Sequence, residues 1–176
     1  MKLPGSPIPQ RHLQPGELLV TQELQWVITL LGSCVAVTMF NARFHLAGIC
    51  HAMLPRPHHK DAPQSNPNEC FRYLSHAIPA MAERFSQIGL QPAEVEVKMF
   101  GGGNVINMGG DPHDDHWIGS ANVAIAQKLL QSARFRIIAQ NVGGTCGCKI
   151  LFNTGTGEVL HKHLSHRVSK TTGKRI

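Results

Sequence analysis

One cysteine stands where a nucleophile would be expected. Cys34 directly follows Gly32 and Ser33 and precedes the strand-like run VAVTMF. Glycine permits backbone angles that are closed to other residues, so the chain can turn sharply and present the thiol at the end of a strand. Backbone N–H groups of such a turn can point at one spot, as the oxyanion of an acyl-transfer intermediate requires. A free cysteine is also often a small core residue, so Cys34 alone leaves both interpretations open.

His51 is the expected partner of this cysteine, because it lies inside an apolar segment, Leu46–Leu54, where an unpaired polar side chain is costly. In an antiparallel hairpin with its turn near residues 41–44, the start of the first strand lies opposite the end of the second. Cys34 and His51 should therefore be neighbours. A nearby imidazole raises the thiolate fraction of a thiol, whose ordinary pKa is about 8.5, and can protonate a leaving amine. The pair predicts a cysteine nucleophile with a histidine base, and a satisfied core histidine remains the other interpretation.

A second set of side chains has the types that bind zinc. Cys146-x-Cys148 and His161-x-His163 lie on what read as neighbouring strands around the turn at residues 154–157. This spacing is a weaker signature than paired C-x-x-C motifs. Alternation along the last strand places both histidines on one face, which an exposed sheet face explains equally well. A zinc-binding domain that uses these four ligands is therefore kept as an alternative.

Apolar patterning predicts the elements that position these residues. Alternating or continuous β-branched runs predict strands at residues 17–23, 25–30, 35–40, 46–54, 95–100, 136–142, 149–153 and 158–164. Apolar residues at three-and-four spacing predict helices at residues 70–85 and 118–132. Pro79 is expected to kink or break the first helix, and Ser120 is a suitable N-cap for the second. This order of elements indicates a single-domain layered α/β sandwich.

The composition fits one globular domain. A chain of 176 residues has room for a single core, and 42% hydrophobic with 16% charged residues is typical of a folded protein. We expect residues 1–12 to form a flexible leader, residues 13–164 the domain and residues 165–176 a disordered basic tail. Much of the net charge of +6 lies at the two ends, and no internal run of basic residues interleaves with aromatic ones. Nucleic-acid binding is therefore not indicated.

The sequence also indicates the cellular compartment. Its first residues contain several prolines and no continuous apolar core, so they do not resemble a signal peptide. No apolar stretch has the length needed to span a bilayer. The five cysteines are odd in number, which argues against a complete disulfide framework. We expect a cytoplasmic protein with free thiols and without membrane insertion.

Several motifs, taken in order, resemble the CheD family of chemoreceptor glutamine deamidases. They are LGSCVAV, GICHAMLP, MFGGGN, IGSANV and GGTCGCKILFNTGTGEVL, and the likeness spans approximately residues 13–164. The resemblance implies a layered α/β fold related to deamidating bacterial toxin domains. It implies hydrolysis of selected glutamines to glutamate on the cytoplasmic helices of methyl-accepting chemotaxis receptors, without a metal or organic cofactor. It further implies a CheC-type phosphatase as a partner that competes for the same surface.

The same resemblance assigns roles to residues. Cys34 matches the nucleophile of the family and His51 its base. The third member, a threonine shortly before the cysteine, falls at Ile28 in a gapless register, whereas the nearest threonine is Thr29. On a strand, one position means the opposite face. We therefore expect either a register slip that brings Thr29 to His51, which is the favoured assignment, or a dyad of Cys34 and His51 alone.

The predicted mechanism is nucleophilic. The Cys34 thiolate attacks the glutamine side-chain carbonyl, and backbone N–H groups around Ser33 and Cys34 hold the oxyanion. His51 protonates departing ammonia and then activates the water that hydrolyses the thioester. A non-catalytic adaptor that binds receptors or the phosphatase is the competing class of function. It would retain its full effect after Cys34→Ala, and it would release no ammonia from a receptor fragment.

Overall fold

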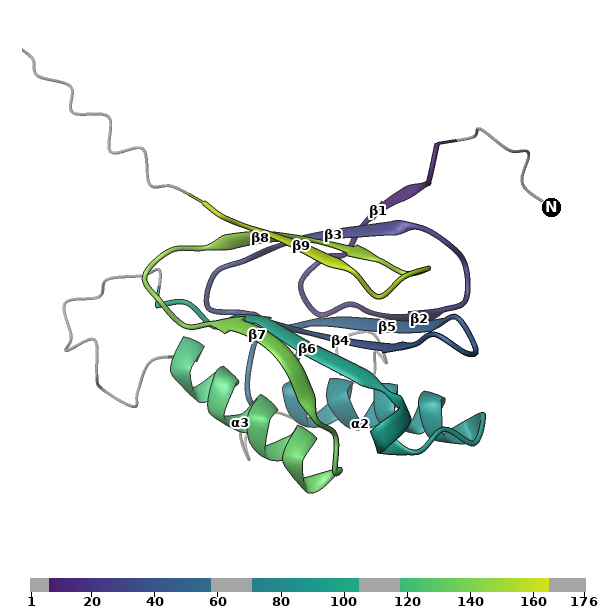
Figure 1. The fold of residues 1–176 in the computed structure, drawn as a ribbon. Coiled ribbons are helices and arrows are strands. Elements are labelled where there is room, and N and C mark those ends of the chain that lie inside the picture. Colours follow the sequence, from purple (N-terminus) through teal and green to yellow (C-terminus); the bar gives the residue numbers. More distant parts are fainter. Residues whose placement is uncertain (1–6, 58–70, 105–117, 165–176) are drawn as a thin grey trace, which may run out of the picture.

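A computed structural model of the chain describes residues 7–57, 71–104 and 118–164. These residues form two β-sheets, two α-helices and one short 3₁₀ helix (Figure 1). The four-stranded sheet has the order β1 (Gln10–His12), β3 (Trp26–Leu31), β8 (Cys148–Asn153), β9 (Val159–His163). The five-stranded sheet has the order β2 (Leu18–Thr21), β5 (Leu46–Ala52), β4 (Val35–Asn41), β6 (Glu96–Gly101), β7 (Ile137–Val142). The helices are α2 (Leu74–Gln87) and α3 (Ile118–Ser132), and η1 (Pro92–Glu94) is the 3₁₀ turn.

The elements stack in three layers. The four-stranded sheet covers one face of the five-stranded sheet, and α2 and α3 cover the other (Figure 1). This arrangement confirms the predicted single-domain layered α/β sandwich. It also explains why every residue of β4 and of β5 is buried, since both faces of these central strands are covered.

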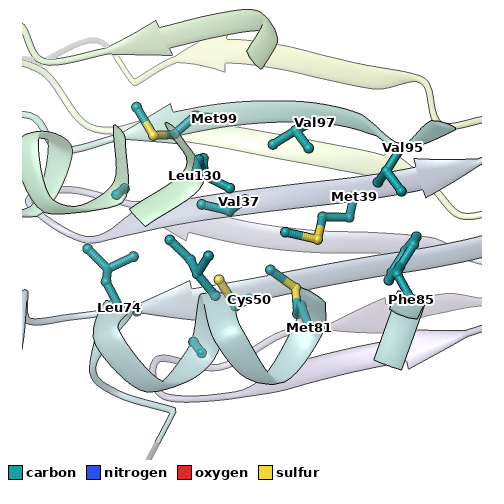
Figure 2. Close-up of a cluster of buried hydrophobic side chains, with 14 of the residues drawn as sticks. Val37, Met39, Cys50, Leu74, Met81, Phe85, Val95, Val97, Met99 and Leu130 are labelled. Atoms are coloured by element: carbon teal, nitrogen blue, oxygen red, sulfur yellow. The ribbon is translucent and has the colours of Figure 1, made fainter. Parts of the chain in front are cut away.

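The face of the five-stranded sheet that meets the helices carries the larger core cluster. Val37 and Met39 of β4 and Cys50 of β5 pack with α2 residues that include Met81 and Phe85 (Figure 2). A second cluster fills the space between the two sheets and includes residues of β3, β4, β5 and β8. Because side chains alternate along a strand, neighbouring residues of β4 and β5 contribute to different clusters.

The hairpin expected from the sequence is present and fixes the positions that matter for chemistry. β4 and β5 pair antiparallel, with Val35 opposite Ala52 and Ala36 opposite His51. The start of β4 and the end of β5 therefore lie side by side, as predicted.

Two details expected of the helices, a break at Pro79 and an N-cap at Ser120, are absent from the described structure. α2 runs from Leu74 to Gln87 without a break at Pro79. Pro79 lies on the exposed side of this helix, so the backbone hydrogen bond that its missing N–H forfeits is on the side that water can reach, while the buried face continues past it. α3 has the predicted bounds, but it already includes Ile118 and Gly119, so Ser120 lies inside the first turn and is not the N-cap.

The N-terminal boundary also differs from the expectation. Residues 10–12, expected in a flexible leader, form β1 and pair parallel with β3. Trp26 N–H donates to the Pro9 carbonyl at 2.8 Å, and Leu13 N–H donates to the Ile28 carbonyl at 2.9 Å. The side chains of β1 are exposed, so it has no apolar pattern to detect; backbone pairing with an open strand edge holds it. Residues 1–6 and the expected tail, 165–176, lie outside the described residues.

No helix in the described part of the chain has both the length and the apolar character needed to cross a membrane.

The core assignment can be tested on one helix. Phe85 is 1% exposed and packs in the helix-facing cluster, whereas Ile88, the residue directly after the helix, is 43% exposed. Phe85→Ala should lower the free energy of unfolding by about 3–5 kcal/mol through lost burial and a cavity. Ile88→Ala should change it by less than about 0.5 kcal/mol. Urea titration of both variants provides the measurement, and equal losses would show that α2 does not bury the face described.

Candidate active site

The structure brings two of the three predicted residues into direct contact between the sheets. Thr29 comes from β3 of the four-stranded sheet and His51 from β5 of the five-stranded sheet. The hydroxyl oxygen of Thr29 lies 2.7 Å from Nδ1 of His51 and 2.9 Å from the carbonyl oxygen of Leu13. Both side chains are buried, at 3% and 2% exposure. The contact joins residues from the two sheets.

The position of Leu13 fixes which nitrogen of His51 carries the proton. A carbonyl oxygen can only accept, so the single hydroxyl proton of Thr29 is donated to Leu13. The contact between Thr29 and His51 is then a hydrogen bond only if Nδ1–H donates to the hydroxyl oxygen. In the neutral imidazole this leaves a lone pair on Nε2, which is buried and has no hydrogen-bond partner among the described residues. Nε2 is therefore the nitrogen available to accept a proton.

Strand alternation explains why Thr29, rather than Ile28, meets His51. Val27 and Leu31 belong to the cluster between the sheets, and Thr29 lies between them on the same face of β3. The pairing of β3 with β8 runs without interruption from Trp26 to Leu31. Ile28 is buried but points to the opposite face, so Thr29 reaches His51 without any bulge in β3.

Cys34 lies at the same end of the space between the sheets. It immediately precedes β4, is half-buried, and packs against the cluster that contains Ala36. Ala36 is the cross-strand partner of His51, so Cys34 is a diagonal neighbour of the histidine on one face. Diagonal neighbours in a sheet are about 7–8 Å apart at Cα. The thiol is not hydrogen-bonded to the imidazole here, because Nε2 of His51 has no partner among the described residues. His51 is almost fully enclosed, and the thiol is the more accessible member of the pair.

The glycine cluster after β6 holds the turn that carries Cys34. Gly102 N–H donates to the Cys34 carbonyl at 2.7 Å, and Gly103 N–H donates to the Gly32 carbonyl at 2.8 Å. Gly101 has φ +95°, and a Cβ atom there would lie 2.3 Å from the Cys34 carbonyl oxygen. Only glycine tolerates both the backbone angle and the close approach. The motif MFGGGN thus supports the turn at Cys34.

The Cys34 thiol and the His51 imidazole both favour their neutral forms. Burial raises the pKa of the Cys34 thiol, and the backbone N–H of Cys34 partly opposes this shift. Burial lowers the pKa of His51, against smaller raising effects from the Leu13 carbonyl and the Glu17 carboxylate. The resting pair is therefore a neutral thiol beside a neutral imidazole.

A cavity of about 310 Å³ lies beside the Thr29–His51 pair. Its walls come from residues 12–15, from Ile28 and Leu30 of β3, and from Lys149, in addition to the pair itself. β1 ends at His12, which is paired with Ile28, so the next part of the β3 edge is left uncovered where the cavity forms. Cys34 does not line this cavity, so the cavity reaches the histidine from its threonine side.

The four candidate zinc ligands do not come together. Cys148 lies opposite His163 in the β8–β9 ladder, and the rings of His161 and His163 are in edge contact at 4.5 Å, on one face as predicted. His161 stacks on Phe100 at 6.0 Å between the centroids. In residues 7–57, 71–104 and 118–164, no group of three or more His, Cys, Asp or Glu side chains is arranged to hold a metal ion. The alternative of a zinc site built from all four residues is therefore not supported by the described structure.

Comparison with known proteins gives the family. Residues 53–163 match the family model described as CheD chemotactic sensory transduction, which is well over half of the chain. The chain belongs to the CheD family. This confirms the resemblance found in the sequence motifs. The match begins at Met53, after Thr29, Cys34 and His51, so the assignment of roles to these CheD residues depends on the geometry of this chain.

Named relatives match nearly the whole chain. One, from Geobacter sulfurreducens, is called "Probable chemoreceptor glutamine deamidase CheD 2"; it is 40% identical over 158 residues, covering 90% of this chain and 92% of that protein. A second, from Oleidesulfovibrio alaskensis, is 42% identical over 167 residues, covering 93% and 76% of the two chains. A third, from Maridesulfovibrio salexigens, is 34% identical over 161 residues, covering 90% and 94%. Both of these carry the name "Probable chemoreceptor glutamine deamidase CheD".

The accessibility of the thiols can be tested by alkylation. Cys34 is half-buried at the end of a strand, whereas Cys50 is fully buried and burial raises its pKa to about 12. Iodoacetamide should therefore label Cys34 in the folded protein and leave Cys50 unmodified, because the thiolate is the reactive form and must be reached by solvent. Peptide mapping after a short exposure measures both. Labelling of Cys50 at the same rate as Cys34 would contradict the described burial.

Proposed function

We propose that this chain is a cytoplasmic protein-glutamine deamidase that converts selected glutamines on the cytoplasmic helices of methyl-accepting chemotaxis receptors to glutamate. Cys34 acts as nucleophile, His51 as base and Thr29 as the residue that orients His51. The observation that carries this proposal is the buried Thr29–His51 hydrogen bond, which leaves Nε2 of His51 unpaired at the strand end where Cys34 lies. The substrate class is supported by the names of relatives that share 34–42% of their aligned residues with this chain.

The first half of the reaction forms a thioester. Nε2 accepts the thiol proton while sulfur bonds to the amide carbon, and the carbonyl π electrons move to oxygen. Backbone N–H groups at the turn of Ser33 and Cys34 stabilise the oxyanion. The resulting imidazolium is stabilised through Nδ1–H by Thr29, which is itself held by Leu13, and by the nearby Glu17 carboxylate. Collapse of the intermediate breaks the C–N bond, and Nε2–H protonates the departing nitrogen as ammonia.

The second half regenerates the enzyme. Neutral His51 accepts a proton from water through Nε2, and the hydroxide attacks the thioester carbon. The C–S bond breaks, the sulfur recovers its proton from the imidazolium, and glutamate is released. The net change replaces NH₂ by OH on the side chain. The burial of His51 limits competing water and keeps the imidazole in one orientation through both halves.

The family also predicts a CheC-type phosphatase that competes with receptors for this protein. A purified CheC-type phosphatase from the same organism should slow deamidation of a receptor fragment in a concentration-dependent way, with an increase in KM and little change in kcat, if the two share one surface. An effect on kcat alone would place that partner elsewhere.

The reaction itself can be followed by intact mass. A receptor cytoplasmic fragment incubated with the wild-type protein should gain about one dalton for each glutamine converted and release equimolar ammonia. Cys34→Ala should abolish both. Cys146→Ala is the matched control, because Cys146 is a half-buried free thiol outside the site, and it should retain activity. A Cys34→Ala protein with the wild-type rate would exclude the thioester mechanism, and a wild-type protein that binds receptors without conversion would be an adaptor.

The role of Thr29 can be tested with two substitutions. Thr29→Val keeps the shape of the side chain and removes the hydrogen bond to His51, which should cost about 1–2 kcal/mol of transition-state stabilisation, or roughly a five- to thirty-fold fall in kcat. Thr29→Ser keeps the hydroxyl and should retain most of the rate. Steady-state kinetics measures the loss of catalysis in each variant, and thermal unfolding is the control for a loss of stability. A silent Thr29→Val in a stably folded protein would leave Cys34 and His51 as a dyad.

The pH dependence of the rate follows from the pKa shifts of His51 and Cys34. The reactive form needs neutral His51, whose pKa burial lowers, so the acid limb of kcat/KM should have its midpoint below the ordinary histidine value of about 6.5. It also starts from the protonated thiol, whose pKa burial raises, so no alkaline loss should occur up to about pH 8.5. A plateau across neutral pH is expected in rate measurements. An acid limb centred above pH 6.5 would instead indicate a thiolate–imidazolium pair.

A further inference from the structure

Asn122 on α3 links the nucleophile turn to the strand that carries the base. Its side chain is 0% exposed, and its amide nitrogen donates to the Ser33 carbonyl at 2.9 Å and to the Met53 carbonyl at 2.9 Å. Ser33 directly precedes Cys34, and Met53 follows His51 by two positions. One buried amide group therefore uses both of its N–H bonds to hold two segments that are distant in sequence.

The hydrogen bond to Ser33 determines where the Cys34 N–H points. The Ser33 carbonyl and the Cys34 N–H belong to one planar trans peptide, in which the two groups point in opposite directions. Because Asn122 holds the carbonyl toward α3, the N–H must point away from the helix, to the side where the Cys34 side chain packs against the cluster between the sheets. In agreement with this direction, the Cys34 backbone N–H stabilises the thiolate and so lowers the pKa of its own thiol.

We propose that Asn122 is a positioning residue that fixes the Ser33–Cys34 peptide, so that the Cys34 N–H serves as an oxyanion donor. The inference rests on the proposed deamidase function. If this peptide rotated by half a turn, the Ser33 carbonyl would face the developing oxyanion and repel it. Asn122 acts through the backbone and does not touch the substrate.

The surroundings of Asn122 fit a residue kept for its donors. Its Oδ1 is buried and has no hydrogen-bond partner in the part of the chain that the structure describes, which costs stability and is not explained by packing alone. Gly119, three residues earlier and on the same side of α3, brings the helix close to the glycine turn: a Cβ atom there would lie 2.6 Å from the Gly102 carbonyl oxygen. This close approach lets a side chain as short as asparagine reach the Ser33 carbonyl.

The test compares two buried asparagines. Asn122→Ala removes both donors, whereas Asn41→Ala is the matched control, because Asn41 is also buried and donates to a backbone carbonyl, that of Glu94, at the opposite end of β4. Loss of an oriented oxyanion donor should lower kcat for a receptor fragment by about ten- to a hundred-fold with little change in KM. Asn41→Ala should keep kcat within about twofold of the wild-type value, even if its thermal stability falls as much as that of Asn122→Ala.

A second readout separates positioning from a general disturbance of the site. Alkylation of Cys34 by iodoacetamide needs the thiol but forms no oxyanion, so Asn122→Ala should change the labelling rate far less than it changes kcat. Parallel losses of labelling and turnover, or an unchanged kcat, would overturn the proposal. If Asn122→Ala does not fold, Asn122→Asp has nearly the same shape and at most one donor proton, and it should still lower kcat. A wild-type protein without turnover would be a failure of the proposed function, not of this inference.

Discussion

The hydrogen bond from His51 to Thr29 is the constraint on which the rest of the site depends. It exists only because a strand of one sheet faces a strand of the other across a packed cluster, with Leu13 at the edge to accept the threonine proton. This chain of contacts sets the tautomer of His51 and leaves its Nε2 without a partner among the described residues. The cross-strand partner of His51 is Ala36, two positions after Cys34. Packing of the two sheets therefore has a direct chemical consequence.

The turn that carries Cys34 is positioned from the other side by backbone contacts. The glycine turn after β6 donates to the carbonyls of Gly32 and Cys34, and Asn122 of α3 holds the carbonyl of Ser33 between them. All three layers contribute here: Thr29 of the upper sheet contacts His51, the central sheet carries His51 and begins β4 directly after Cys34, and α3 of the lower layer holds the turn (Figure 1). Each layer therefore contributes one element to the proposed site.

Sequence patterning predicted most of the fold because burial on two faces leaves a strong signal. The continuous apolar runs of β4 and β5 predicted the hairpin, and its pairing predicted that Cys34 and His51 lie near each other. Periodicity cannot say which face of β3 meets the other sheet, so the choice between Ile28 and Thr29 needed the structure. The role proposed for Asn122 could not be predicted from the motif IGSANV, because nothing in a helical pattern reveals that a polar residue reaches the backbone of a distant turn.

The central claim concerns one proton, and it can be measured directly. In protein labelled with ¹⁵N-histidine, long-range ¹H–¹⁵N correlation spectra at neutral pH report which ring nitrogen of His51 is protonated, with the His51 signals assigned by their absence in His51→Gln. The account predicts a protonated Nδ1 and a bare Nε2, and a loss of this preference in Thr29→Val. A protonated Nε2 with a bare Nδ1 in the wild-type protein would contradict it.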